Sequence, residues 1–134
     1  MAVNNIIKRI QNIMRQDAGI NGDAQRIEQM TWMFFLKVYD AQEETWEWKD
    51  GNYKSIIPED LRWRKWAVDK KDGEALTGDA LLSFVNEKLF PALKNLPVNA
   101  DTPRAKSIVQ ETFADLNQYM KNGTLLRQVV NIVN

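Results

Sequence analysis

The sequence has 134 residues, of which 44% are hydrophobic and 27% are charged, and its 18 Lys and Arg balance 18 Asp and Glu. This composition suits a single folded domain of ordinary size, and its zero formal charge excludes a domain-wide basic surface, so any contact with nucleic acid has to be local. Cysteine and histidine are both absent, which excludes disulfides, thiol nucleophiles, serine triads and histidine-bearing zinc sites.

The first segment has the pattern of an amphipathic helix. Apolar residues recur at helical intervals from Val3 to Met14, and the pattern stops near Gly19. Asp23 then occupies a position where a helix N-cap is expected. We therefore predict a second helix over about residues 24–46.

The middle of that second helix, residues 30–40, is apolar almost all round. A helix of this kind is buried on most sides, so we expect it to be the central core element. We expect the fold to depend on the burial of four side chains of this helix, those of Trp32, Phe34, Leu36 and Val38. Full burial of Phe34 predicts a loss of about 3 to 5 kcal/mol when it is replaced by Ala.

Helical spacing fails between Lys49 and Gly78, where turn signals and Pro58 interrupt it. This pattern predicts an ordered loop with short helical turns over about residues 59–68. The loop contains Trp63 and Trp66, which at this spacing share one face and are more often core than surface residues.

Helical spacing returns after residues 77–79 and continues to Leu93, with Pro91 expected to kink or end the helix near Phe90. Pro103 suits the first position of a further helix, whose apolar stripe runs over residues 108–120 and closes at residues 122–123.

Thr124 is expected to cap a last helix, which reaches residue 134 without a stop signal. We therefore expect the sequence to be a piece of a longer protein. The predicted fold class is all-α, a compact bundle of about five helices with an ordered Trp-rich loop between the second and third main helices.

Motifs for catalysis are missing from this pattern. The six glycines are scattered, and neither GxGxxG nor GxxxxGK[ST] occurs. Glu43, Glu44 and Glu47 lie at helical spacing and could bind Mg²⁺, but a like-charged group near a helix end is more often a solvated face. Residues 47–49 match the Glu-x-Lys motif of metal-dependent nucleases, but the acidic residue that precedes this motif on a strand in those enzymes is missing. No residue is assigned a catalytic, cofactor or metal role.

One stretch has the character of a nucleic-acid surface, because its cations alternate with the two loop tryptophans. Three aspartates dilute its charge. A second, weaker set lies on the polar side of the first helix, where ordinary helix solvation is the alternative. The DNA-contact candidates are Arg62, Arg64, Lys65, Lys70 and Lys71 in the loop, and Lys8 and Arg15 in the first helix.

Four stretches resemble the N-terminal domain of modification subunits of type I restriction-modification systems. They are NGDAQRIEQMTWMFFLKVYD (21–40), IIPEDLRWRKW (56–66), TGDALLSFVNEKLFPALKNL (77–96) and FADLNQYMKNGTLLRQVVNIV (113–133). The resemblance spans almost the whole chain, and it consists of core and cap residues.

The resemblance implies that residues 1–134 form a helical domain ahead of an adenine-N6 methyltransferase domain that uses S-adenosylmethionine. The Asn-Pro-Pro-Phe motif of that domain is not in this sequence, so no cofactor is expected in this chain. The implied partners are DNA, a specificity subunit, a second modification subunit and the motor-nuclease restriction subunit. In such complexes the domain helps to enclose DNA and to sense its methylation state.

Two other classes of function are weighed against this one. A free-standing helical adaptor would bind a partner helix in a groove, with half-exposed apolar stripes and a chain complete at Asn134. A small nuclease is nearly excluded by the lack of histidine and of an ordered acidic cluster. The absence of cysteine and of any long apolar run favours a cytoplasmic protein without a membrane span.

Overall fold

The structure is a computed structural model that describes residues 2–67 and 76–134. Its elements in chain order are α1 (Ala2–Met14), α2 (Gly22–Lys49), the 3₁₀ turn η1 (Glu59–Leu61), α3 (Trp63–Trp66), α4 (Gly78–Ser83), the π-helical turn η2 (Phe84–Leu89), α5 (Phe90–Lys94), α6 (Arg104–Ala114) and α7 (Gly123–Val133). All regular elements in these two ranges are helical, which confirms the predicted all-α class. No helix within them is long and apolar enough to cross a membrane.

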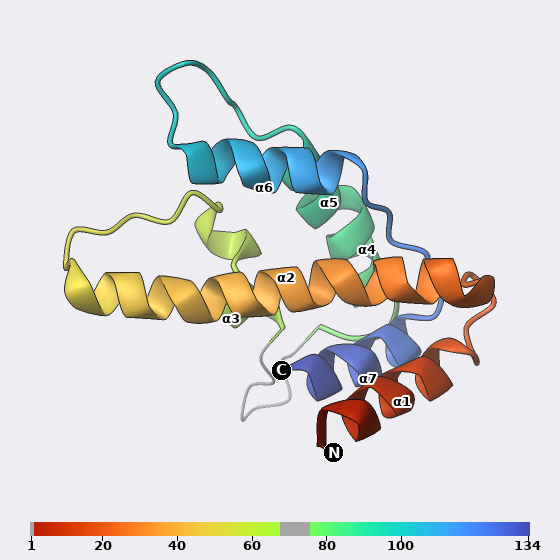
Figure 1. The fold of residues 1–134 in the computed structure, drawn as a ribbon. Coiled ribbons are helices and arrows are strands. Elements are labelled where there is room, and N and C mark those ends of the chain that lie inside the picture. The colour runs from red at the N-terminus through yellow and green to blue at the C-terminus, as the bar shows by residue number, and fades with distance from the viewer. Residues whose placement is uncertain (1, 68–75) are drawn as a thin grey trace.

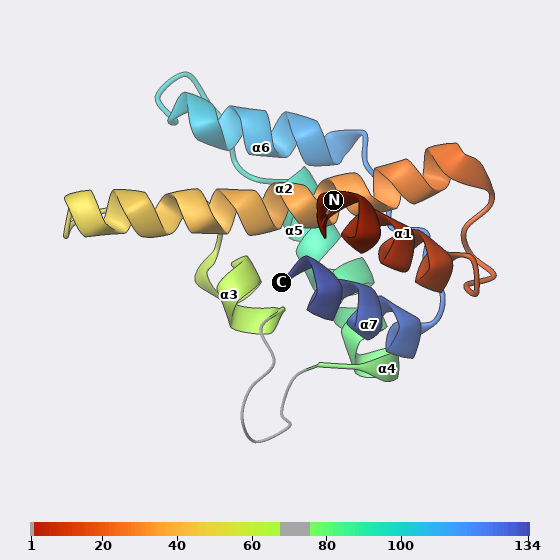
Figure 2. The same cartoon turned by 60° about the horizontal axis from the view of Figure 1, so that its bottom comes forward.

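The long helix α2 organises the fold. It lies between α6 on one side and α1 with α7 on the other, and both views show its C-terminal end reaching past the other helices (Figures 1 and 2). α7 packs against α1, α4 and α2, while α5 packs against α6. The short helical turns predicted after Pro58 are present as η1 and α3.

The core is built around the aromatic side chains of α2 and its neighbours. Trp32 is fully buried, stacked on Trp66 with centroids 6.4 Å apart and edge-on to Phe90 at 5.1 Å. Trp63 is buried beside Trp66, with centroids 5.1 Å apart. The prediction that the two loop tryptophans are core residues is therefore confirmed.

Burial of α2 is one-sided, which corrects the expectation that it is covered almost all round. Trp32 and Leu36 are buried, but Phe34 is only half-buried and Val38 is 64% exposed. Phe34 and Val38 lie on the side of α2 that the other described elements cover only in part, with Ile7 of α1 beside them. The loss of about 3 to 5 kcal/mol predicted for Phe34→Ala assumed full burial. Because Phe34 is only half-buried, that prediction is wrong.

Two buried polar side chains fix the segment between α6 and α7. The carboxylate of Asp17 accepts hydrogen bonds from the backbone N–H groups of Gly19 at 2.7 Å and of Lys121 and Asn122 at 2.9 Å. Gln29 accepts one from the backbone N–H of Tyr119 at 2.8 Å. Because these groups hold residues 119–122 outside a helix, α6 ends at Ala114, and the prediction of one helix through residue 120 is wrong.

Asparagines, rather than the predicted residues, precede two helices. Asn21 is the N-cap of α2, and its backbone N–H donates to Gln25 Oε1 at 2.7 Å, whereas Asp23 lies in the first turn and pairs with Arg26. Asn122 caps α7, and its side-chain oxygen accepts from the backbone N–H of Leu125 at 3.0 Å. The assignments of Asp23 and Thr124 as caps are therefore each wrong by two residues.

Prolines act only partly as predicted, because a helical distortion, but no helix end, lies near Pro91. The helix does not end at Phe90 but continues through Pro91 to Lys94, preceded by the π-helical turn η2. In this turn the backbone N–H of Phe90 donates to the carbonyl of Val85, five residues back. A proline inside a helix removes a backbone hydrogen bond and distorts the helix, and here the distortion lies in the turn before Pro91. Pro103 is the residue before α6 rather than its first residue.

Candidate functional site

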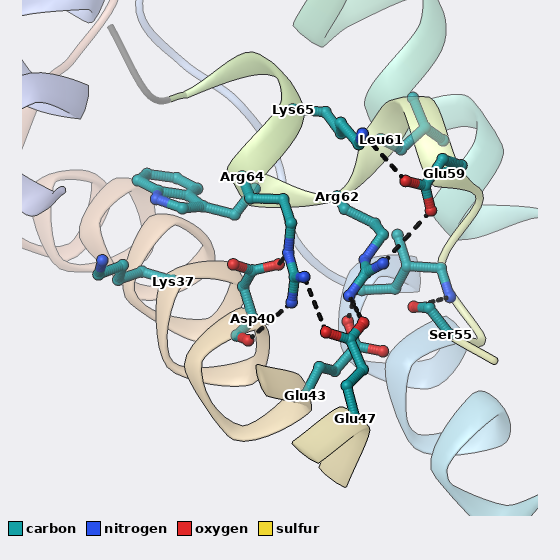
Figure 3. Close-up of polar contacts among 12 residues, drawn as sticks. Lys37, Asp40, Glu43, Glu47, Ser55, Glu59, Leu61, Arg62, Arg64 and Lys65 are labelled. Atoms are coloured by element: carbon teal, nitrogen blue, oxygen red, sulfur yellow. Dashed lines mark hydrogen bonds and ion pairs between the residues drawn. The ribbon is translucent and has the colours of Figure 1, made fainter. Parts of the chain in front are cut away.

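The arginines predicted to contact DNA are ion-paired with carboxylates of α2 (Figure 3). Arg64 lies just inside α3, and its Nε is 2.9 Å from Asp40 Oδ1 while its Nη1 is 2.9 Å from Glu47 Oε2. Arg62 precedes α3 and pairs with Glu47 on α2 and, at 3.3 Å, with Glu59 on η1. These contacts fasten the loop that carries α3 to the side of α2.

Glu43 completes this network from the interior. Its side chain is fully buried, it accepts a hydrogen bond from the Tyr53 hydroxyl at 2.8 Å, and its Oε1 is 3.6 Å from Arg62 Nε. The expectation of a solvated carboxylate face is therefore wrong for Glu43, although Glu44 is exposed. Glu43 lies two turns after Leu36, on the covered side of α2, which places its carboxylate inside the fold.

The network has a defined electrostatic character. Hydrogen bonds from Arg64 and Arg62 lower the pKa of Glu47, and those from Lys65 and Arg62 lower the pKa of Glu59. Burial and the hydrogen bond to Glu43 raise the pKa of Tyr53 above its ordinary value.

Charge counting shows what this network can attract. Three cations, Arg62, Arg64 and Lys65, face four carboxylates, those of Asp40, Glu43, Glu47 and Glu59. The cluster has no surplus positive charge to attract a phosphate. Its carboxylates are already bonded to guanidinium groups, and no set of three or more metal-ligating side chains occurs among residues 2–67 and 76–134.

Of the other described DNA-contact candidates, Lys65 lies at the edge of this cluster and the rest lie outside it. Lys65 is half-exposed and lies 3.2 Å from Glu59. Lys8 is exposed on α1, and Arg15 is exposed directly after the end of that helix. Lys70 and Lys71 fall outside the described residues.

Arg127 is a buried polar residue that the sequence pattern did not reveal. It lies on α7, and its guanidinium donates to the carbonyls of Leu76 at 3.2 Å, Trp66 at 3.5 Å and Ala67. It also donates to Asn131 Oδ1 on the next turn at 2.9 Å. A single cation thus holds both flanks of residues 68–75 against α7.

The opposite side of α2 carries an open apolar groove. Its volume is about 610 Å³, and its lining is Ile7 from α1 and Met30, Thr31, Phe34, Phe35, Val38, Tyr39 and Gln42 from α2. A smaller hollow of about 310 Å³ follows along the same helix, lined by Ala41, Glu44, Thr45 and Trp48. An exposed apolar groove with a polar rim is typical of an interaction surface, and we take it as the candidate functional site.

Trp48 stands out on this surface because its side chain is 89% exposed. Large aromatic side chains are commonly buried in proteins and serve as anchors in interfaces. The sequence did contain a signal for this site. Residues 30–40 hold more apolar side chains than a single covered face can take, and the excess forms the groove.

Comparison with known proteins gives a consistent set of relatives. The family described as HsdM N-terminal domain matches residues 3–133. The chain is 49% identical over 134 residues to the type I restriction enzyme EcoEI methylase subunit of Escherichia coli. The matched region covers all of this chain and 27% of the length of that relative.

Two solved structures have the same fold. A modification subunit assigned to a type I restriction enzyme from Vibrio vulnificus YJ016 matches with a TM-score of 0.84 and 33% identity, over 98% of this chain and 30% of the other. A chain from a structural study of complex assembly and conformational transition in the type I R-M system matches with a TM-score of 0.80 and 32% identity. This match covers 99% of this chain and 25% of the other. The chain thus spans between a quarter and a third of the length of these relatives.

Proposed function

The chain belongs to the HsdM N-terminal domain family of type I modification subunits, and we propose that it is the accessory helical domain of such a subunit, which helps the complex to assemble and to enclose DNA. The observation that carries this proposal is the apolar groove on the uncovered side of α2. A groove of this kind serves association rather than chemistry, because its lining offers no carboxylate, amine, imidazole or thiol group.

Methyl transfer is assigned to the rest of the parent subunit. The parent's methylase identity implies S-adenosylmethionine as methyl donor and, by resemblance, adenine N6 in DNA as acceptor. The groove does not fit this cofactor, because its lining holds no carboxylate for the ribose hydroxyls and no glycine-rich turn follows a strand in the described residues. Adenine must also be flipped out of the duplex into a separate pocket, which suits a division between an enclosing domain and a catalytic one.

Assembly partners follow from the same resemblance. The proposed complex contains a specificity subunit, a second modification subunit and, for cleavage, the restriction subunit, and it acts on DNA in the cytoplasm. Trp48 and the groove form an exposed aromatic and apolar surface of the kind that protein interfaces bury. This surface supports a contact with another protein of the complex.

Contacts with DNA are proposed as local and secondary. Lys8 on α1 and Arg15 just after its end are exposed, and Lys65 is half-exposed. Arg62 and Arg64 can reach a phosphate only by giving up part of their bonds to Glu47 and its neighbours. The enclosing role therefore depends on a few phosphate contacts and on the partner subunits, not on a strongly basic surface.

A free-standing helical adaptor is the second candidate, because it would have the same half-exposed apolar surface. The 49% identity to a methylase subunit favours the first proposal. The open reading frame around this sequence separates the two. Continuation into a glycine-rich loop and an Asn-Pro-Pro-aromatic motif supports the methylase subunit, whereas a stop codon after Asn134 supports the adaptor.

Deletion within the full-length subunit tests the proposal. The intact subunit and a version without residues 1–134 are each purified with the specificity subunit, and S-adenosylmethionine binding and DNA dissociation are measured for both. We expect cofactor affinity to be retained and DNA dissociation to become at least about tenfold faster, which corresponds to about 1.4 kcal/mol. Unchanged DNA dissociation would contradict the enclosing role, and loss of cofactor binding would contradict the division of labour.

A further inference from the structure

α1 and α7 lie side by side on one face of the molecule, as both views show (Figures 1 and 2). Their apolar residues are turned inward, and Ile10 and Met14 of α1 and Leu126 and Val130 of α7 are fully buried. In residues 5–14 of α1 and in the whole of α7, every exposed side chain is a cation, an amide or a hydroxyl. Neither helix therefore presents an exposed carboxylate or an exposed apolar side chain over these residues.

The exposed side chains form one row on each helix, at intervals of three or four residues. The row on α1 is Asn5, Lys8 and Asn12, and the row on α7 is Thr124, Gln128 and Asn131. Arg15 extends the first row past the end of α1, because its backbone N–H still donates to the carbonyl of Gln11 at 3.0 Å. We call the two rows, together with Arg9, Arg15, Gln16 and Lys121, the α1–α7 face.

The charge of the α1–α7 face is unbalanced. Its cations are Lys8, Arg9, Arg15 and Lys121, all exposed. Within residues 2–67 and 76–134, none of the four forms an ion pair. Asp17 lies close by, but it is buried, and its carboxylate accepts hydrogen bonds from the backbone N–H groups of residues 121 and 122. α4, which packs against α7, carries one acid, Asp79.

This surplus distinguishes the α1–α7 face from the loop that carries α3. In that loop three cations face four carboxylates, so the positive charge is cancelled where it arises. On the α1–α7 face the positive charge is directed to solvent, where it can attract an anion. A chain with zero formal charge thus concentrates unpaired cations on one side.

We propose that the α1–α7 face binds the sugar-phosphate backbone of duplex DNA without reading its base sequence. The inference rests on the proposed enclosing function, and it names the surface and the chemical group that this function uses. Phosphate oxygens accept hydrogen bonds from Lys, Arg, Asn, Gln and Thr side chains, and these are the residue types that the face exposes. From Lys8 to Arg15 the row rises about 10 Å, the length of about three phosphates along one strand.

A protein partner fits the α1–α7 face less well. The centres of protein interfaces are rich in apolar and aromatic side chains and poor in Lys. The α1–α7 face exposes neither apolar nor aromatic side chains, and two of its four cations are Lys. The chemistry of the face therefore favours DNA over a second protein.

Salt-dependent DNA binding by the assembled complex tests the proposal. The full-length subunit with Lys8→Gln, Arg9→Gln and Arg15→Gln is combined with the specificity subunit, and affinity is measured for a duplex that the complex methylates and for one that it does not. We expect the slope of log affinity against log salt to become shallower by about three, and affinity near 100 mM salt to fall at least about tenfold. Both duplexes should lose affinity equally within about twofold, because phosphates carry no sequence information. Adding Lys121→Gln should reduce the slope by about one more.

A second triple variant is the matched control. Lys54→Gln, Lys88→Gln and Arg104→Gln remove three exposed charges from other parts of the chain and should change the slope by less than about one. Exchange of Lys for Arg and of Arg for Lys at positions 8, 9 and 15 keeps the charge and should leave DNA binding at the parent level. Thermal unfolding of all these subunits should agree, because the substituted side chains are exposed.

Three results would overturn the proposal. The first is a slope change no larger than that of the control, and the second is a loss of affinity confined to the methylated duplex. The third is a triple variant that binds DNA like the parent but no longer assembles with the specificity or restriction subunit, because the face would then be a protein contact. If removal of residues 1–134 accelerates DNA dissociation while the triple variant does not, the DNA face is wrong and the proposed function stands. If neither change accelerates it, both are wrong.

Discussion

The indole of Trp32 lies edge-on to the ring of Phe90, with centroids 5.1 Å apart and an interplanar angle of 87°. Trp32 is also stacked on Trp66, so one side chain joins α2 to both the α3 loop and α5. Phe34, two residues later, has no such enclosure and lines the open groove. Neighbouring aromatic residues of α2 therefore have different roles.

Replacing Trp32 with Ala should cost about 3 to 5 kcal/mol of unfolding free energy, because it removes a fully buried ring and leaves a cavity. Phe34→Ala should cost less than half as much, since part of that ring is already in water. Urea denaturation of the two variants provides the comparison. Equal losses would mean that the groove is closed in solution.

Replacing Gln29 with Leu should cost about 1 to 3 kcal/mol, because it leaves the backbone N–H of Tyr119 without its acceptor inside the fold. Gln128→Leu on the exposed side of α7 is the matched control and should change stability by less than about 0.5 kcal/mol. Thermal or chemical unfolding of both variants measures the difference. A neutral Gln29→Leu would show that the segment before α7 is held by other contacts.

Acid should weaken the domain in a defined pH range. The folded state lowers the pKa of Glu47 below its ordinary value of 4.5, so this group adds stability above pH 4.5 and loses that contribution as the pH falls toward its folded pKa. Glu47→Gln should be less stable than the parent chain at neutral pH and show a shallower decline in acid. Unfolding midpoints measured between pH 7 and pH 3 test both statements, and parallel declines would assign the acid sensitivity to other carboxylates.

Lys8 and Arg15 should contribute to DNA affinity through phosphate contacts. In the full complex, the double change to Gln should weaken DNA binding and reduce the slope of log affinity against log salt by about two, because each phosphate contact releases about one counterion. Lys88→Gln, an exposed charge in η2, is the control. An unchanged salt slope would remove Lys8 and Arg15 from the DNA surface.

Much of the fold could be predicted from the spacing of apolar residues. The pattern in residues 3–14 gives α1, and that around residues 24–46 gives α2. The positions of helix ends were harder to predict, because they depend on contacts between residues far apart in the sequence. Asp17 and Gln29 stop α6 early by binding backbone groups about 90 to 105 residues away, and no local signal records this.

The candidate site could be predicted only in part. The cations around Trp63 and Trp66 are visible in the sequence, but their pairing with Asp40, Glu43 and Glu47 depends on how the loop returns to α2. The carboxylates do share one face at helical spacing, which was an available signal. Which side of an all-round apolar helix stays open is decided by its neighbours, so the groove could not be located in advance.

The central claim is that the two sides of α2 serve different purposes, one holding the fold and the other making contacts outside it. Leu36 and Val38 are two residues apart, with exposures of 1% and 64%. Each is changed to Asp in the full-length subunit, and thermal unfolding and DNA dissociation of the assembled complex are measured.

We predict that Leu36→Asp unfolds the domain, whereas Val38→Asp leaves its unfolding within about 0.5 kcal/mol of the parent and accelerates DNA dissociation. A Val38→Asp subunit that unfolds like Leu36→Asp, or that assembles and retains DNA like the parent, would contradict the claim.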